Sequence, residues 1–386
     1  MDYFFVAHSN FALNFLRQQD LSKTFVISPR SISVGLATVA YLAKGPTGNE
    51  IREAILMKGL LDEHLWNQFG NLQDMIKPYK GEEESEVQVY MANKFAMRQG
   101  HDIKSDLHIF AYRMFNGGFM SFNFRNPELS SERIDMFVSG NKHNFEGMVP
   151  PEKISADIDT IMANVMLFKG RWKDRFNVHD TEQLEFWTSP DSSRLADFMA
   201  KEDSILFSAN DHFQVIRLKF SDEKFALNIF LPKIRYGLMA ALQELTPEII
   251  YQLLKDFENK NVKMKLPKFR IESTFDLQDS LVALGIRKVF DPKQARFKSN
   301  GDMGIIQRLL RKITFQKTNA INVISMFAHK AIIEIDEYGA SATTAVICNK
   351  AEHEAGEGQS IDFVADHPFM FMLTKEDRIF FMGLHN

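Results

Sequence analysis

The chain has almost no cysteine, because Cys348 is the only one among its 386 residues. A framework of intramolecular disulfides is therefore excluded. No run of 18 apolar residues occurs, so the sequence predicts no membrane span. The formal net charge of −4 gives no overall positive field, which argues against nucleic acid as a partner.

The start of the chain, Met1 to His8, lacks a basic segment followed by an apolar stretch and a cleavage site. No Asn-x-Ser/Thr acceptor is present either. Together these features favour a cytoplasmic or unconventionally secreted protein. A secreted protein whose leader had been removed would look nearly the same, so an extracellular location stays open as the alternative.

What the chain does have is enough apolar material for a large core. Hydrophobic residues make up 45% and charged residues 25%, which is typical of soluble globular proteins. The 35 Phe residues recur in strand-like stretches. We interpret them as core packing, because aromatic side chains are favoured on half-buried sheets.

Helical patterns dominate the first half. Apolar residues recur at helical spacing between His8 and Arg17. Ser28-Pro29 predicts the start of a longer helix, with Ser28 as N-cap and the proline in the first turn. Gly45-Pro46 should end that helix, and Thr47 should cap the next short one.

Strand patterns dominate the second half. A nearly continuous apolar run at 161–168 predicts a buried central strand, and runs at 213–220 and 226–231 predict a hairpin. A helix is expected over 275–284. Further strands are expected at 262–269, 331–335, 369–373 and 379–382. The simplest interpretation is one large α+β domain over residues 1–386.

Two stretches interrupt these patterns. Lys298 to Ala320 reads as an exposed excursion that carries a basic cluster of Arg308, Arg311, Lys312 and Lys317. Gly339 to Ser360 begins with small residues and ends acidic and glycine-rich. Long loops without regular structure inside a compact domain are usually functional or disordered.

No enzyme signature accompanies these stretches. The nucleophile elbow, the zinc-protease helix motif, the phosphate-binding loop and the calcium loop are all missing. Cys348 has no neighbouring group that would activate a thiolate. The sequence therefore predicts a protein that is not an enzyme and needs neither a metal nor another cofactor.

Five motifs, in order along nearly the whole chain, resemble the serpin family. They are Phe25-Val-Ile-Ser-Pro-Arg-Ser-Ile-Ser33, Asn164-Val-Met-Leu-Phe-Lys-Gly-Arg-Trp172, His329-Lys-Ala-Ile-Ile-Glu-Ile-Asp-Glu337, Ala365-Asp-His-Pro-Phe-Met-Phe371 and Phe380-Phe-Met-Gly383. The resemblance implies the serpin fold, which has a large central β-sheet, further sheets and an exposed reactive-centre loop at 338–361. It also implies a monomer that inhibits serine-type proteases as a suicide substrate, in which the cleaved loop inserts into the central sheet while still bound to the protease.

Insertion sets conditions that the loop sequence can meet. The hinge must turn freely, as Gly339 allows, and its first residues must be small. By two-residue alternation, Ala340, Ala342 and Thr344 would face the interior, with Ser341, Thr343 and Ala345 outward. The family prefers Thr or Ser where Ala340 and Val346 stand. The same run read alone would be a plain Ala/Thr linker.

The scissile bond follows from the length of the loop. The family usually cleaves near the seventeenth residue counted from the position of Glu337, which is His353, so we place the bond first at His353–Glu354. An extended loop to His353 spans roughly 50 Å, whereas one that ends at Lys350 spans about 40 Å. Lys350 and Glu352 are the alternative sites.

Six further residues match structural positions of the family. Ser28, Ser31, Asn164 and His329 correspond to a buried hydrogen-bond cluster under the opening sheet, and Trp172 and Glu337 to the point at which the loop first inserts.

Several alternatives stay open. The chain could be a non-inhibitory serpin with a chaperone, carrier or storage role, or a cross-class inhibitor of papain-like cysteine proteases. The basic cluster around Arg308 could bind a glycosaminoglycan, although a solvated surface is the simpler explanation. Cys348 could form a mixed disulfide that blocks insertion, or serve as a small apolar residue.

Overall fold

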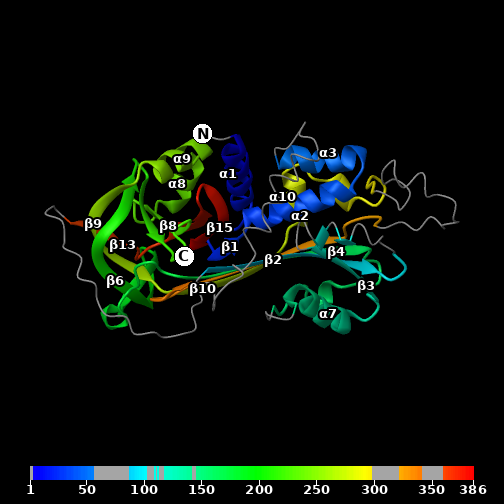
Figure 1. Cartoon of the computed structure of the whole chain (residues 1–386), viewed down its shortest axis with the longest axis horizontal. Coiled ribbons are helices and arrows are strands. Elements are labelled where there is room, and N and C mark those ends of the chain that lie inside the picture. The colour runs from blue at the N-terminus through cyan, green and yellow to red at the C-terminus, as the bar shows by residue number, and fades with distance from the viewer. Residues whose placement is uncertain are drawn as a thin grey trace.

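The computed structural model describes residues 3–55, 87–101, 108–109, 111–112, 117–140, 145–297, 321–340 and 360–386. Two β-sheets form the body of the molecule, and helices pack around them (Figure 1). Within these described ranges, no helix is both long enough and apolar enough to cross a membrane.

The first sheet has six strands in the order β10-β11-β12-β4-β2-β3. Helix α7 (Pro127–Ser139) lies on one face of this sheet, and α2 (Pro29–Leu42), α3 (Gly45–Ala54) and α10 (Gln278–Ala283) lie on the other (Figure 1). The strands are β10 (Phe269–Asp276), β11 (Met326–Ile335), β12 (Gly339–Ala340), β4 (Thr160–Arg171), β2 (Val87–Arg98) and β3 (Gly117–Phe122).

Strand β4 confirms the predicted central strand. Its side chains alternate between two cores: Ile161 and Val165 face the core under α7, whereas Met162 and Met166 face the main core. A strand that is covered on both faces needs apolar residues at almost every position. This explains the nearly continuous apolar run in the sequence.

The second sheet has nine strands, and eight of them follow the order β1-β15-β14-β8-β7-β6-β9-β13, with β5 paired to β6. The predicted hairpin is present as β7 and β8, which pair antiparallel from Phe213↔Pro232 to Lys219↔Ala226. The strands are β1 (Phe25–Ile27), β5 (Glu182–Ser189), β6 (Ser192–Ala209), β7 (Phe213–Lys219), β8 (Phe225–Pro232), β9 (Glu258–Pro267), β13 (Ile361–Val364), β14 (Phe369–Lys375) and β15 (Arg378–His385).

The remaining described elements are three helices and three 3₁₀ turns. They are α1 (Tyr3–Leu16), α8 (Leu238–Glu244), α9 (Pro247–Lys255) and the 3₁₀ turns η1 (Pro151–Lys153), η2 (Val178–Asp180) and η3 (Lys288–Phe290). Of these turns, η1 contacts α7 and η3 contacts α3, beside the first sheet.

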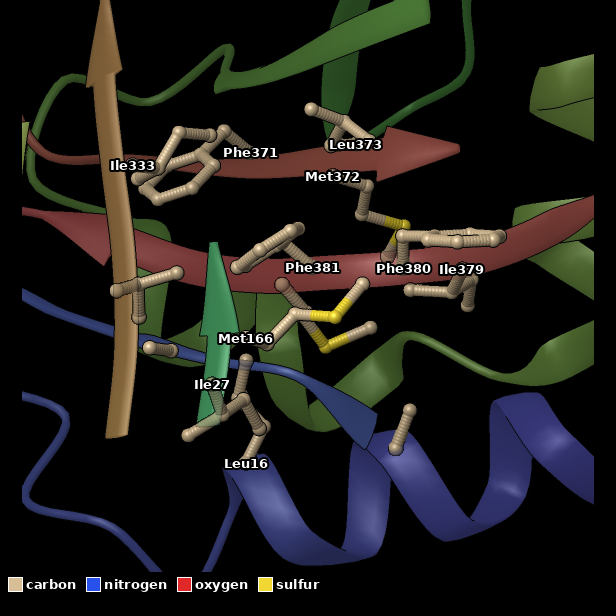
Figure 2. Close-up of a cluster of buried hydrophobic side chains, with 14 of the residues drawn as sticks. Leu16, Ile27, Met166, Ile333, Phe371, Met372, Leu373, Ile379, Phe380 and Phe381 are labelled. Carbon is tan, nitrogen blue, oxygen red and sulfur yellow. The ribbon is translucent and has the colours of Figure 1, made fainter. Parts of the chain in front are cut away.

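The main core lies where the two sheets face each other. Figure 2 shows Met166 of β4 and Ile333 of β11 beside Phe371 of β14 and Phe381 of β15. All four side chains are buried. The six-stranded sheet therefore packs against the second sheet through β4 and β11 on one side and β14 and β15 on the other.

Local sequence signals predicted the start of one helix correctly and the start of another wrongly. Ser28 is the N-cap of α2, and its side chain accepts a hydrogen bond from the Ser31 N–H, as predicted. The prediction for Thr47 is wrong: α3 begins at Gly45, with Lys44 at the cap. Thr47 lies buried inside α3, where its hydroxyl accepts a hydrogen bond from Arg296 N–H at 3.1 Å.

Two other boundaries also differ from the prediction. The run 262–269 divides into two strands, because β9 ends at Pro267 and β10 begins at Phe269. The helix expected over 275–284 covers only Gln278–Ala283, since residues 275 and 276 continue β10. In both places strand pairing extends the sheet further than the local pattern indicates.

Candidate functional site

The start of the predicted reactive loop is already paired with the six-stranded sheet. Gly339 and Ala340 form β12 between β11 and β4, where Ala340 lies opposite both Ile335 and Gly170. Ala340 is fully buried, as two-residue alternation predicts for an inward-facing hinge residue. The described start of the loop therefore lies inside the sheet rather than at its edge.

Only glycine fits at residue 339. Its φ of +146° is strained for any residue with a side chain. A Cβ atom added there would lie 2.0 Å from the Gly170 carbonyl oxygen and 2.7 Å from Arg171 Cα. The backbone of β4 thus passes directly against Gly339, and the small size of this residue is what lets the loop start between the strands.

A tight turn holds the hinge in this position. The carboxylate of Asp336 accepts hydrogen bonds from the Tyr338 N–H at 2.8 Å and the Gly339 N–H at 3.0 Å. Trp172, just after β4, donates its indole N–H to the Asp336 carbonyl at 2.8 Å and its backbone N–H to the Tyr338 carbonyl at 2.9 Å. Burial raises the pKa of Asp336, an effect that the neighbouring Glu337 and Glu334 reinforce and the two N–H donors oppose.

Glu337, the next residue of the same turn, is held in place by its own side-chain contacts. Its side chain is almost completely buried, with 5% exposed. One carboxylate oxygen accepts a hydrogen bond from the Thr181 hydroxyl at 2.8 Å and lies 3.3 Å from Lys268 Nζ. A buried carboxylate needs such partners. We call Trp172, Asp336, Glu337, Gly339 and Ala340 the hinge cluster.

A second group of polar side chains lies at the middle of the sheet. Ser28, Ser31, Asn93, Asn164 and His329 are all buried, and we call them the shutter cluster. Asn93, Asn164 and His329 are opposite one another on β2, β4 and β11. Ser28 and Ser31 belong to the start of α2, which packs against this face of the sheet.

Asn164 uses its whole side-chain amide in this cluster. Its oxygen accepts hydrogen bonds from the Ser31 hydroxyl at 2.5 Å and from His329 Nδ1 at 2.6 Å. Its NH₂ group donates to the Ser31 carbonyl at 3.0 Å and to the Asn93 side-chain oxygen at 2.6 Å. The residue therefore joins α2, β2, β4 and β11 at one point.

His329 is neutral and holds one tautomer. Its Nε2 atom accepts a hydrogen bond from the backbone N–H of Ser28 at 3.1 Å, so the ring proton must be on Nδ1. Nδ1 then donates to Asn164. Burial lowers the pKa of His329 to about 3. Ser28 completes the cluster by donating its hydroxyl to the Phe380 carbonyl on β15 at 2.7 Å.

The hinge cluster lies where β12 separates β4 from β11, and the shutter cluster lies where β4 and β11 pair directly with each other. Below the hinge, these strands pair directly and in parallel, from Met326↔Ile161 to Ile332↔Leu167. Above it, each strand pairs with β12 instead. Further insertion requires the direct pairs to separate, and His329 and Asn164 form the polar contact that this separation would break.

The structure thus brings together the predicted residues that it describes. Ser28, Ser31, Asn164 and His329 meet in the shutter cluster, and Trp172, Glu337, Gly339 and Ala340 meet in the hinge cluster. The remaining predicted residues lie outside the described residues: Ser341, Ala342, Thr343, Thr344, Ala345, Val346, Cys348, Lys350, Glu352, His353, Glu354 and the basic cluster Arg308, Arg311, Lys312 and Lys317.

Three residues of the site had not been predicted. Asn93 interrupts the apolar strand β2, and a lone polar residue in such a run is the signal that would have found it. Asp336 lies next to Glu337, where its turn-forming role depends on residues 338 and 339. Lys268 gives no signal in the sequence, because its proximity to Glu337 depends on the pairing of β10 with β11.

Comparison with known proteins agrees with this arrangement. The family model described as Serpin (serine protease inhibitor) matches residues 6–386. Serine protease inhibitor 42Dd of Drosophila melanogaster is 27% identical over 377 residues, which cover 95% of this chain and 92% of that protein.

Solved structures of two other proteins show the same fold. The structure of Serpin48, from the insect Tenebrio molitor, matches with a TM-score of 0.82 at 20% identity, covering 99% of this chain and 97% of that one. The structure of human thyroxine-binding globulin in complex with thyroxine matches with a TM-score of 0.81 at 18% identity, covering 99% of this chain and 97% of that one. The chain belongs to the serpin family.

Proposed function

We propose that this protein inhibits serine-type endopeptidases as a suicide substrate. The observation that carries the proposal is the hinge: Gly339 and Ala340 are small, buried and already paired between β4 and β11. Because the loop starts between β4 and β11, it can extend its pairing from β12 without a separate step that opens the sheet at this end. The names of relatives such as serine protease inhibitor 42Dd support the same function.

The proposed reaction uses the chemistry of the protease. The active-site serine hydroxyl attacks the scissile carbonyl, the amine of the following residue leaves with a proton, and the loop remains joined to the enzyme through an ester. We place this bond at His353–Glu354, with Lys350 and Glu352 as alternatives. The released loop then inserts from Ala340 onward and carries the enzyme along before the ester is hydrolysed.

The sheet provides the driving force for this movement. Insertion replaces one parallel ladder between β4 and β11 with two antiparallel ladders, one on each side of the new strand. It therefore adds hydrogen bonds, and antiparallel pairing is slightly more stable per residue. The inserted strand also buries side chains against the main core on the face where Ala340 already lies.

The test compares the parent chain with two variants at the same buried position. Each is incubated with trypsin, chymotrypsin, elastase or papain and examined on denaturing gels and by mass spectrometry. The parent and Ala340→Ser should give a covalent complex that survives boiling, and the released fragment should begin at Glu354. Ala340→Arg should be cleaved without forming a complex, because a buried unpaired charge costs several kcal/mol.

A different result would identify another function. Cleavage of the parent without complex formation, and without a gain in heat stability afterwards, would overturn loop insertion and favour a carrier or storage role. That alternative has support in the structural match to thyroxine-binding globulin. A stable complex with papain alone would instead identify a cross-class inhibitor.

A further inference from the structure

We propose that a cavity beside the hinge binds a small organic anion that has an apolar, planar body. The cavity has a volume of about 290 Å³. Its walls come from the segment after β4 and from β6, β7 and β9, and they include Trp172, Phe176, Ser204 and Arg217. This site is independent of the proposed inhibition, since it requires neither cleavage nor insertion of the loop.

The charges around the cavity are positive but mostly paired. Of its four cationic residues, Lys173 and Lys219 share Glu223, with N–O distances of 2.8 and 3.0 Å. Lys201 pairs with Asp203 at 3.1 Å. These three lysines therefore already have carboxylate partners. They contribute to the positive potential around the cavity, but their ammonium groups are not available as the main binding group for an anion.

Arg217 differs from these lysines. Its Nε atom donates to the Asn228 side-chain oxygen at 2.8 Å, and its guanidinium lies 4.3 Å from the ring centroid of Phe257. Among the residues that the structure describes, it has no carboxylate partner. Burial lowers the pKa of Arg217 to about 10, so the group is still charged at neutral pH.

A partly buried guanidinium without a counter-ion favours an anion that can enter the cavity. The planar fork of arginine binds carboxylate or sulfonate oxygens through two parallel N–H donors. The exposed lining of the cavity is mainly polar, and Trp172, Phe176 and Leu218 add a smaller apolar part to it. A ligand with an acidic head and an aromatic body matches both features, and the volume restricts it to a small molecule.

The position of the cavity relates such a ligand to the hinge. Trp172 lines the cavity and at the same time donates its indole N–H to the Asp336 carbonyl of the hinge cluster. Phe176 lines it too and donates its backbone N–H to the Glu337 carbonyl at 3.1 Å. A bound ligand would therefore contact the residues that hold the hinge turn.

The test uses 8-anilinonaphthalene-1-sulfonate, an aromatic sulfonate that fluoresces when bound, with the intact uncleaved protein. Saturable binding with energy transfer from tryptophan is expected. Arg217→Met should weaken the affinity at least tenfold, and Arg125→Met, the same change at an exposed arginine, should leave it within twofold. The uncharged analogue N-phenyl-1-naphthylamine should bind the parent at least tenfold more weakly than the sulfonate does.

A second variant keeps the test valid if Arg217→Met fails to fold. Ser204 is an exposed wall residue, so Ser204→Phe should fold normally and obstruct the cavity, which again weakens binding at least tenfold. Equal affinity of the sulfonate for the parent and for both correctly folded variants would overturn the proposal. The absence of saturable binding to the parent would overturn it as well.

Discussion

Replacing Asn164 with leucine tests whether the shutter cluster stabilises the closed sheet. Two buried polar groups would lose their only described hydrogen bond, the Ser31 hydroxyl and His329 Nδ1–H. The Ser31 carbonyl lies inside α2 and keeps its helical hydrogen bond. A buried polar group that loses its hydrogen bond costs about 1–3 kcal/mol. Even at the low end of this range, Asn164→Leu should reduce the free energy of unfolding by about 2 kcal/mol.

The assay is urea unfolding of the uncleaved protein, followed by circular dichroism through its first transition. Asn261→Leu provides the matched control, because Asn261 is a half-buried sheet residue whose only described side-chain bond, to Glu202, is 3.3 Å long. That variant should change stability by no more than about 0.5 kcal/mol. If Asn164→Leu lost less than about 1 kcal/mol, the cluster would not be a significant restraint on β4 and β11.

Three further predictions concern the hinge, the inserted state and pH. Gly339→Ala should remove Ala340 from the sheet, because the new Cβ atom would lie 2.0 Å from the Gly170 carbonyl oxygen, and hydrogen exchange of the hinge amides should accelerate at least tenfold. Val346→Thr should stabilise the cleaved form by about 1 kcal/mol in thermal unfolding, since continuing the pairing of Ala340 for six residues sets residue 346 opposite Asn164 and His329. Burial lowers the pKa of His329 to about 3, below its value of about 6.5 in the unfolded chain. The native state then binds fewer protons, so His329 makes stability fall as the pH drops from about 6.5 toward 3, by up to about 1.4 kcal/mol per unit.

Each of these predictions has its own control. Gly285→Ala also places a side chain at a positive φ, of +94°, but in open space, so exchange at the hinge should stay as it is in the parent. Val346→Ala lacks the hydroxyl group and should give no stabilisation of the cleaved form. His329→Gln should reduce the pH dependence of unfolding by about one proton, and an unchanged slope would show that His329 does not carry it.

The sequence predicted the fold where local pattern and tertiary environment agree. The apolar run of β4 and the Ser28-Pro29 helix start are both strong local signals, and both were correct. Thr47 shows the limit of such signals. A threonine before a helical pattern is a good N-cap, but Gly45 and Pro46 start the helix earlier and leave Thr47 to bond with the segment at Arg296.

The site was predictable through motif resemblance more than through physics. Ser31 and Asn164 are 133 positions apart, and nothing in their local pattern predicts that they meet. Small hinge residues are visible in the sequence, whereas the pairing of Ala340 with both β4 and β11 is not. That pairing depends on the turn made by Asp336 and on the contact of Gly339 with the β4 backbone.

The junction at β12 makes the sheet comparable to a branch point in strand exchange between nucleic acids. One more residue of the loop moves the branch down by one position, so the whole gap never has to open at once. The direct ladder between β4 and β11 has seven residue pairs, and His329↔Asn164 is the fourth from either end. Migration of the branch would therefore reach the polar contact between His329 and Asn164 midway along the ladder. A loop that has passed this contact would have only apolar or neutral contacts left to displace on that face of the sheet.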